Sequence, residues 1–182
     1  MEKSVLMGGF GGQGVQTCGK LLIYAANEED KIATFYSQYG GAMRGGTSNC
    51  TVITSDEEIG APNKKIVDYV VAFNIPSFKK FEERVAVGGT MIVNSTLISE
   101  DMYTRKDINY VGVPATQISQ DLGSPKVLNV VILGFFCEYS GMVEPKVAQE
   151  VVLKQFAKKP QFIEMNTRSF ETGVAEAKNA KK

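Results

Sequence analysis

The sequence predicts a three-layer α/β/α domain, Rossmann-like, with a mostly parallel but mixed sheet. Apolar strand-like segments alternate with helical segments over most of the chain, which is typical of α/β architecture. The first of these strands runs directly into a glycine-rich loop and a helix. With 182 residues, 43% of them hydrophobic, the chain is long enough to bury a core without disulfides. We therefore expect one domain over residues 1–182, with a Lys-rich tail from about residue 178.

The strand–loop–helix unit at Ser4–Ala26 is the first candidate site. An apolar run at residues 4–7 precedes the loop, where Gly9, Gly11 and Gly14 have the G-x-G-x-x-G spacing of dinucleotide-binding folds. Glycine lets backbone N–H groups approach a ligand closely, and a helix N-terminus attracts an anion. A tight structural turn without a ligand is the alternative. The loop residues expected at a phosphate or a partner surface are Gly9, Gly11, Gly12, Gln13 and Gly14.

The second predicted strand, residues 31–36, argues against a nicotinamide cofactor. In an NAD-binding unit an Asp or Glu near the end of this strand holds the ribose hydroxyls. Here the strand ends in Tyr36-Ser37-Gln38, and the nearby acids precede it.

A second glycine-rich segment, residues 39–49, connects this strand to a third predicted strand at 49–55. Four glycines within residues 40–46 disfavour a crossover helix, so these two strands should run antiparallel and the sheet should be mixed. Arg44 lies between glycines, where its guanidinium could reach a carboxylate or phosphate, although a surface arginine in a loop is the simpler alternative. The candidate residues here are Arg44, Gly45, Gly46 and Ser48.

The remaining pattern extends the alternation. Residues 67–73 form a near-continuous apolar strand, and Asn74 follows at its carboxyl end, where α/β sheets meet ligands. Ser77 is expected to cap a helix at 78–85. The further expected elements are a turn at Gly88-Gly89, strands at 90–94 and 109–113, and helices at 115–122, 126–139, 147–158 and 166–178.

Composition narrows the chemistry. Lys plus Arg and Asp plus Glu both number 20, so nothing indicates nucleic acid or an anionic membrane as partner. No signal peptide or membrane span is recognisable, and we expect a cytoplasmic protein. The chain has no histidine, which excludes Ser-His-Asp and Cys-His catalysis. Its three cysteines form no C-x-x-C motif, so we expect no metal site and no catalytic residue; Cys18 is expected to be a buried apolar side chain.

Three segments together resemble the gamma subunits of 2-oxoacid:ferredoxin oxidoreductases, over nearly the whole chain. They are Gly9-Phe10-Gly11-Gly12-Gln13-Gly14, Tyr39-Gly40-x-x-x-Arg44-Gly45-Gly46-x-Ser48-x-x-x-Val52 and Glu58-Ile59-Gly60-Ala61-Pro62. The sequence around Arg44 looks closest to the 2-oxoglutarate branch, and the branched-chain 2-oxoacid and pyruvate branches remain open. The family pattern often has a glutamate two residues before the motif arginine, where this chain has Ala42.

The resemblance implies a non-catalytic subunit, inactive alone, of an enzyme that converts a 2-oxoacid to its acyl-CoA. Thiamine diphosphate, Mg²⁺ and iron–sulfur clusters would reside on alpha, beta and ferredoxin-like delta subunits, and ferredoxin would accept the electrons. The two glycine segments would share in coenzyme A binding. A free-standing nucleotide-binding oxidoreductase and a pure assembly module are the alternatives, and the isolated chain could form a homodimer.

Overall fold

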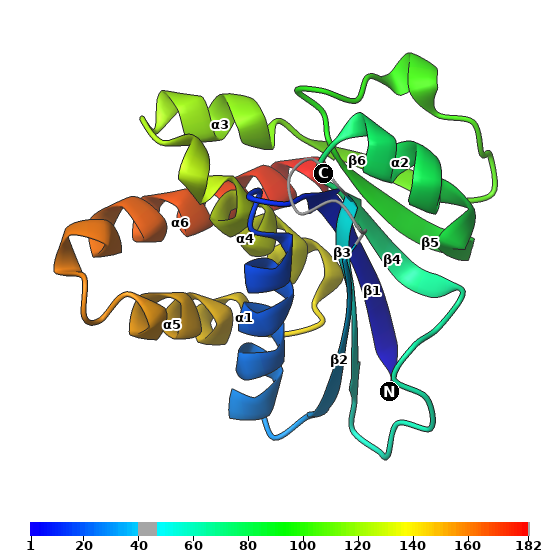
Figure 1. Cartoon of the computed structure of the whole chain (residues 1–182), viewed down its shortest axis with the longest axis horizontal. Coiled ribbons are helices and arrows are strands. Elements are labelled where there is room, and N and C mark those ends of the chain that lie inside the picture. Colours follow the sequence, from blue (N-terminus) through cyan, green and yellow to red (C-terminus); the bar gives the residue numbers. More distant parts are fainter. Residues whose placement is uncertain (40–46, 182) are drawn as a thin grey trace.

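A computed structural model describes residues 1–39 and 47–181 of the chain, with a sheet of strand order β2-β3-β1-β4-β5-β6 (Figure 1). The strands are β1 (Lys3–Phe10), β2 (Ile32–Tyr39), β3 (Thr47–Ser55), β4 (Val67–Ala72), β5 (Val85–Asn94) and β6 (Asn109–Val113). The predicted α/β fold is confirmed, and the strand at 109–113 has the predicted bounds.

The sheet is mixed, as the glycine-rich connection predicted. β3 pairs antiparallel with both β1 and β2, whereas β1, β4, β5 and β6 run parallel. The register places Phe35 opposite Val52 and Tyr36 opposite Thr51. The connection between β2 and β3 is too short for the helical crossover that a parallel neighbour would need.

The helices cover the two faces of the sheet unequally. Four of them, α1, α4, α5 and α6, gather on one face, and α2 lies on the other (Figure 1). The bounds are α1 (Val15–Glu28), α2 (Ile75–Phe81), α3 (Ala115–Asp121), α4 (Leu128–Ser140), α5 (Pro145–Gln155) and α6 (Ile163–Ala180). The three layers are therefore present, with most of the hydrophobic core between the sheet and the four-helix side.

Helix α4 is buried on nearly all sides, as its continuous apolar character predicted. It packs most closely on α6. An ideal Cβ on Gly134 would lie 2.3 Å from the Phe170 carbonyl oxygen, and one on Gly173 would lie 2.1 Å from the Val131 carbonyl oxygen. The two helices approach to backbone contact because these positions lack side chains.

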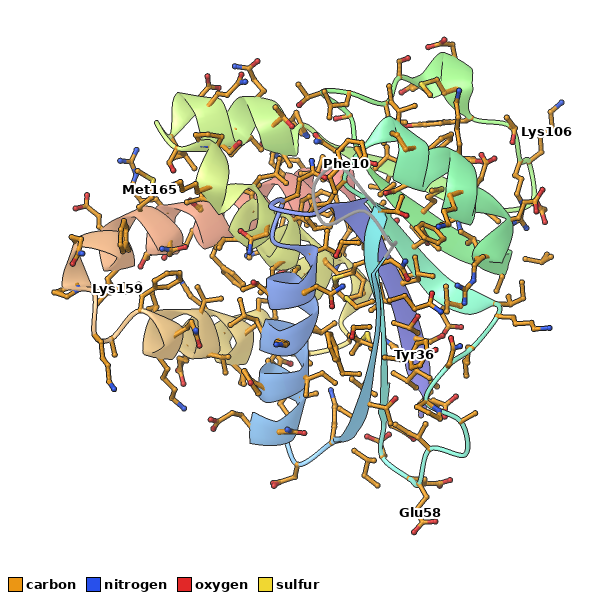
Figure 2. The ribbon with its side chains drawn as sticks, viewed as in Figure 1. Phe10, Tyr36, Glu58, Lys106, Lys159 and Met165 are labelled. Carbon is orange, nitrogen blue, oxygen red and sulfur yellow. The ribbon has the colours of Figure 1, made fainter. Side chains whose placement is uncertain are left out.

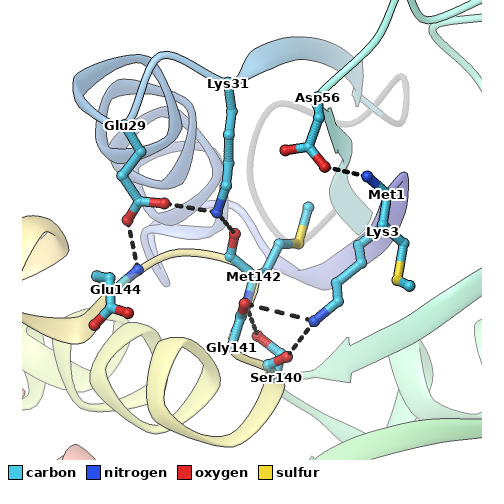
Figure 3. A network of polar contacts seen from close by, with 9 residues as sticks. All are labelled: Met1, Lys3, Glu29, Lys31, Asp56, Ser140, Gly141, Met142 and Glu144. Carbon is cyan, nitrogen blue, oxygen red and sulfur yellow. Dashed lines mark hydrogen bonds and ion pairs between the residues drawn. The ribbon is translucent and has the colours of Figure 1, made fainter.

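Two lysines hold the C-terminal end of α4 (Figure 3). Lys3 Nζ donates to the Ser140 carbonyl at 2.9 Å, and Lys31 Nζ donates to the Met142 carbonyl at 2.9 Å. Lys31 also pairs with the Glu29 carboxylate at 2.6 Å. Cations suit the negative end of a helix dipole, so these contacts tie β1 and the α1–β2 turn to the buried helix.

The predicted turn at Gly88-Gly89 is wrong as a strand boundary, because β5 begins at Val85 and includes both glycines. Gly88 has φ 76°, and a Cβ on Gly89 would lie 2.7 Å from the Asp68 carbonyl oxygen. The register between β4 and β5 shifts at this point. The glycines therefore allow an irregularity within a paired strand.

Candidate functional site

The connections that leave β1 and β4 run to opposite faces of the sheet. This reversal of the face gives the sheet a topological switch point between the two strands. β1 leads into α1 on the four-helix face, and the neighbouring parallel strand β4 leads into α2 on the opposite face. In open α/β sheets, ligands bind in the crevice that such a reversal opens at the carboxyl ends of the strands. The predicted loop at 9–14 and Asn74 both lie at this place; Figure 2 labels Phe10 where β1 ends.

The glycines of the loop have different roles. Strand β1 extends to Phe10 and pairs with β3 throughout, so Gly9 is a strand residue and not part of the turn, which corrects the loop boundary. A Cβ on Gly9 would lie 2.7 Å from Val15 Cγ2 and 2.8 Å from Gln13 Oε1. Gly9 therefore lets the loop and α1 pack over the end of β1.

The turn itself contains two left-handed glycines. Gly12 has φ 95° and Gly14 has φ 77°. A Cβ on Gly14 would lie 2.7 Å from the Asn129 side chain, whereas a Cβ on Gly12 would meet none of the described residues within 4 Å. Gly14 thus serves the packing of α1 on α4. Gly12 leaves open space beside its backbone, as close approach by a ligand or a partner requires.

A carboxamide bridge joins the segments that follow β1 and β4. Gln13 Oε1 accepts from the Phe10 backbone N–H at 2.7 Å and from Asn74 Nδ2 at 2.9 Å. Asn74 Oδ1 accepts from the Ser77 backbone N–H at 2.9 Å and caps α2. The prediction that Ser77 is the cap is wrong: Pro76 occupies the first turn and places the cap position at residue 74. Both polar atoms of the Asn74 amide are thus bonded within the chain.

A pocket of about 320 Å³ lies at the N-terminus of α1. The first backbone bond of this helix runs from Cys18 N–H to the Gly14 carbonyl at 2.9 Å, so the preceding N–H groups have no intrahelical acceptor. These donors and the positive end of the dipole favour an anion at this position. The pocket is lined by Phe10, Gly11, Gly12, Gly14, Val15, Gln16, Thr17 and Ser48.

Gln16 joins the two halves of this pocket, and the sequence reasoning missed it. Its Nε2 donates to Ser48 Oγ at 3.0 Å and to the Asn49 carbonyl at 2.9 Å, which links α1 to the start of β3. Its Oε1 is buried, and it has no hydrogen-bond partner among the described residues. The available signal was its place in the first turn of the helix, directly after the glycine loop.

The structure thus brings together only part of the predicted set. Gly11, Gly12, Gly14 and Ser48 line the pocket. Gln13 and Asn74 form the neighbouring bridge, and Gly9 lies in β1. Three predicted residues lie outside the described part of the chain: Arg44, Gly45 and Gly46.

The thiols near the pocket are not activated. Cys18 is fully buried, and burial raises its pKa well above the usual value. Burial likewise raises the pKa of Cys50 to about 12. Residues 1–39 and 47–181 contain no cluster of three or more potential metal ligands. None of the helices in this described part combines the length and apolar character that a membrane span requires.

Comparison with known proteins identifies the family. Residues 4–176 match the family of pyruvate ferredoxin/flavodoxin oxidoreductases. The chain belongs to this family.

Two curated relatives differ in length. The ketoisovalerate oxidoreductase subunit VorA of Methanothermobacter thermautotrophicus is 37% identical over 175 residues, which make up 95% of this chain and 36% of VorA. This chain therefore spans about a third of that relative. The 2-oxoglutarate synthase subunit KorC of Methanothermobacter marburgensis is 32% identical over 179 residues, and the match covers 95% of both chains.

A solved structure agrees in both fold and extent. The gamma subunit of a keto/oxoacid ferredoxin oxidoreductase from Geobacter sulfurreducens has a TM-score of 0.87 and 26% identity, and the match covers 99% of this chain and 98% of that one. The resemblance to the gamma subunits is confirmed, and so is the mixed α/β fold.

Proposed function

We propose that this chain is the gamma subunit of a 2-oxoacid:ferredoxin oxidoreductase in the cytoplasm, with residues 1–182 as one gamma-type domain. It supports the oxidative decarboxylation of a 2-oxoacid to its acyl-CoA and is inactive alone. Alpha, beta and ferredoxin-like delta subunits carry the thiamine diphosphate, Mg²⁺ and iron–sulfur clusters, and ferredoxin takes the electrons. The family match over residues 4–176 carries this proposal. The lack of histidine and the buried thiols are in keeping with a supporting subunit.

The proposed substrate is 2-oxoglutarate. The 2-oxoglutarate synthase subunit KorC matches this chain over 95% of both lengths, whereas the match covers only 36% of VorA. VorA is the more identical of the two, so 2-oxoisovalerate and pyruvate are the competing substrates. The complex, purified through a tag on this chain, should reduce a ferredoxin-type dye fastest with 2-oxoglutarate. Faster reduction with either other acid would reassign the branch.

The role proposed for the pocket is to hold a phosphate group of coenzyme A. The observation that supports this is the space at Gly12, beside the N–H groups at the start of α1 that have no intrahelical acceptor and the Ser48 hydroxyl. A volume of about 320 Å³ is at the lower end for ligand pockets, so this chain would hold one part of coenzyme A and a partner subunit would complete the site. Arg44, Gly45 and Gly46 join the proposal from their sequence motif alone.

The alternative is that the pocket receives a partner subunit and no ligand. The bonds from Asn74 to Gln13 and to the Ser77 backbone favour it, because they occupy Gln13 Oε1 and both polar atoms of the Asn74 amide within the chain. A free-standing nucleotide-binding oxidoreductase is the least favoured, since Tyr36-Ser37-Gln38 supplies no acid for a ribose.

Two glycine substitutions in the assembled complex separate these readings. Gly12 (φ 95°) and Gly123 (φ 85°) are both left-handed, and a Cβ at either meets nothing within 4 Å. Alanine therefore costs a similar backbone strain, about 1–3 kcal/mol, at both positions. Only Gly12 lines the pocket.

We expect Gly12→Ala to raise KM for coenzyme A about 10- to 100-fold, which corresponds to losing one charge-assisted hydrogen bond of roughly 1.5–3 kcal/mol. KM for the 2-oxoacid should stay the same, and Gly123→Ala should change neither constant. Equal KM values for coenzyme A in the two variants would refute ligand binding at the pocket. If Gly12→Ala instead prevents the subunits from co-purifying, the assembly alternative is correct.

A further inference from the structure

The two outer strands of the sheet differ in how they are protected. β6 has five residues and is preceded by the ion pair of Arg105 and Asp107, at 2.6 Å. β2 has eight residues, Ile-Ala-Thr-Phe-Tyr-Ser-Gln-Tyr, with no charge and no proline. Its register with β3 runs without a bulge from Ile32 to Tyr39. Charges, prolines, bulges and short length are the features that normally prevent a sheet edge from pairing, and β2 has none of them.

The outer side of β2 therefore presents pairing groups. Within residues 1–39 and 47–181, β3 is the only strand that pairs with β2, and Figure 1 shows β2 as the last strand on its side of the sheet, next to α1. In an antiparallel pair, alternate residues direct their N–H and C=O groups away from the partner. About half of the backbone groups of β2 thus point outward.

Apolar side chains accompany this edge. Ile32 and Tyr36 lie on the same face of β2, 42% and 38% exposed, and Tyr24 on the adjacent α1 is 51% exposed. Figure 2 labels Tyr36 on the lower part of the sheet, on the side away from α1. The edge thus combines open backbone with exposed apolar surface.

We propose that β2 pairs antiparallel with β2 of a second copy of this chain, across a two-fold axis perpendicular to the sheet. Such a contact is self-complementary, because the same strand lies on both sides. A second copy meets no like charge, since the strand is uncharged and the chain has 20 basic and 20 acidic residues.

The axis also restricts the register. A two-fold axis perpendicular to the sheet keeps each side chain on the same face in both copies, and directly opposed residues of an antiparallel pair also share a face. The pairing must therefore centre on a residue and not between two residues. Phe35 and Tyr36 are the two central residues of β2. Centring on Tyr36 places Thr34 opposite Gln38 of the second copy. Tyr36 is 38% exposed and can meet its counterpart across the axis, whereas Phe35 packs against the hydrophobic core. The register centred on Tyr36 is therefore the expected one.

The size of the contact sets its strength. Eight strand residues extend about 27 Å, and with a layer thickness of about 10 Å they cover roughly 270 Å² on each copy. Specific interfaces bury about 800 Å² on each partner. We therefore expect a weak dimer that forms reversibly as the concentration rises through the micromolar range.

Sedimentation of the full chain from about 1 to 500 µM tests this. Tyr36→Lys places two like charges next to each other across the proposed axis, so the Kd of the dimer should rise at least tenfold. Val87→Lys is the matched control, because Val87 is 80% exposed on β5, remote from this edge, and should leave the constant unchanged. Circular dichroism confirms that each variant is folded.

Crosslinking tests the register independently. The native cysteines, Cys18, Cys50 and Cys137, are buried, so an added surface thiol reacts selectively. Tyr36→Cys should oxidise to a disulfide-linked dimer, and Val87→Cys should not.

The proposal fails if the chain sediments as a monomer at every concentration, or if Tyr36→Lys leaves a dimer intact. It also fails if hydrogen exchange of the β2 amides slows only when the partner subunits are added, since the edge would then serve a different chain. A dimer without the Tyr36→Cys crosslink would refute the register.

Discussion

The contact between α4 and α6 leads to a quantitative prediction. Gly173→Ala would place a methyl group 2.1 Å from the Val131 carbonyl oxygen and 2.9 Å from the Phe135 backbone nitrogen. Both atoms belong to the backbone of α4, which cannot rotate away. The helices would have to separate by about 1.4 Å to restore a normal contact of about 3.5 Å.

The cost follows from the side chains along this contact. Val131, Phe135 and Phe170 are each fully buried and contribute roughly 2 kcal/mol apiece. If the helices separate by only about 0.5–1 Å of this distance, they forfeit a quarter to a half of that sum, about 1.5–3 kcal/mol, and some overlap remains. Overpacking adds about 1–3 kcal/mol, and the higher helix propensity of alanine returns about 1 kcal/mol. The net loss is about 1.5–5 kcal/mol, against a total stability of about 5–15 kcal/mol.

Urea unfolding, followed by circular dichroism, measures this loss. Gly19→Ala in α1 is the control, because it has the same propensity gain but its Cβ would meet side-chain atoms, Cys50 Sγ at 2.5 Å and the Phe35 ring at 2.9 Å. Side chains can shift where the backbone cannot, so Gly173→Ala should lose more stability than Gly19→Ala. Equal or reversed losses would show that the backbone contact between α4 and α6 does not limit their packing.

Two further predictions concern titration. The three native thiols should not react with a thiol reagent at pH 8 while the chain is folded and should all react in denaturant, because they are buried and the pKa of Cys50 is raised to about 12; one fast thiol in the folded chain would contradict this. Burial raises the pKa of Glu82, but hydrogen bonds from Thr104 and Tyr110 outweigh it and lower the pKa below its usual value. The resulting stability is present above the unfolded pKa of about 4.3 and is lost as the pH falls through the lower folded value, so Glu82→Gln should flatten the decline of the unfolding free energy between about pH 5 and 3. An unchanged slope would assign the acid sensitivity to other groups.

The strand–loop–helix unit shows how far local signals reach. The glycine-rich run placed the turn at the end of β1, but of the three glycines in the G-x-G-x-x-G spacing only Gly14 is left-handed, and the other left-handed residue, Gly12, lies outside that spacing. The same spacing could not show that Gly9 belongs to β1, since that depends on pairing with β3, a contact between residues far apart in the sequence. Gln16 escaped prediction for a similar reason: its partners, Ser48 and Asn49, come from β3.

Helix capping was misassigned for a local reason. Ser77 is a good capping residue, but Pro76 fits the first helical turn and moves the cap to Asn74. Asn74 was expected at the carboxyl end of the strand at 67–73, and it follows β4 as the cap of α2, while its role at a ligand site stays a prediction. Its role as a bridge to Gln13 depended on the reversal between β1 and β4, which no local pattern reveals.

The sequence by itself determined the order of strands and helices, the mixed sheet, the family and the position of the glycine loop. Each of these follows from periodicity, backbone propensity or motifs that act within a few residues of one another. Only the tertiary structure decided, for the described residues, which glycine faces open space, which amide groups are bonded and which strands form the two edges of the sheet. Those outcomes depend on the approach of segments separated by tens of residues, such as β3 beside β1 and α6 against α4, and packing in three dimensions sets them.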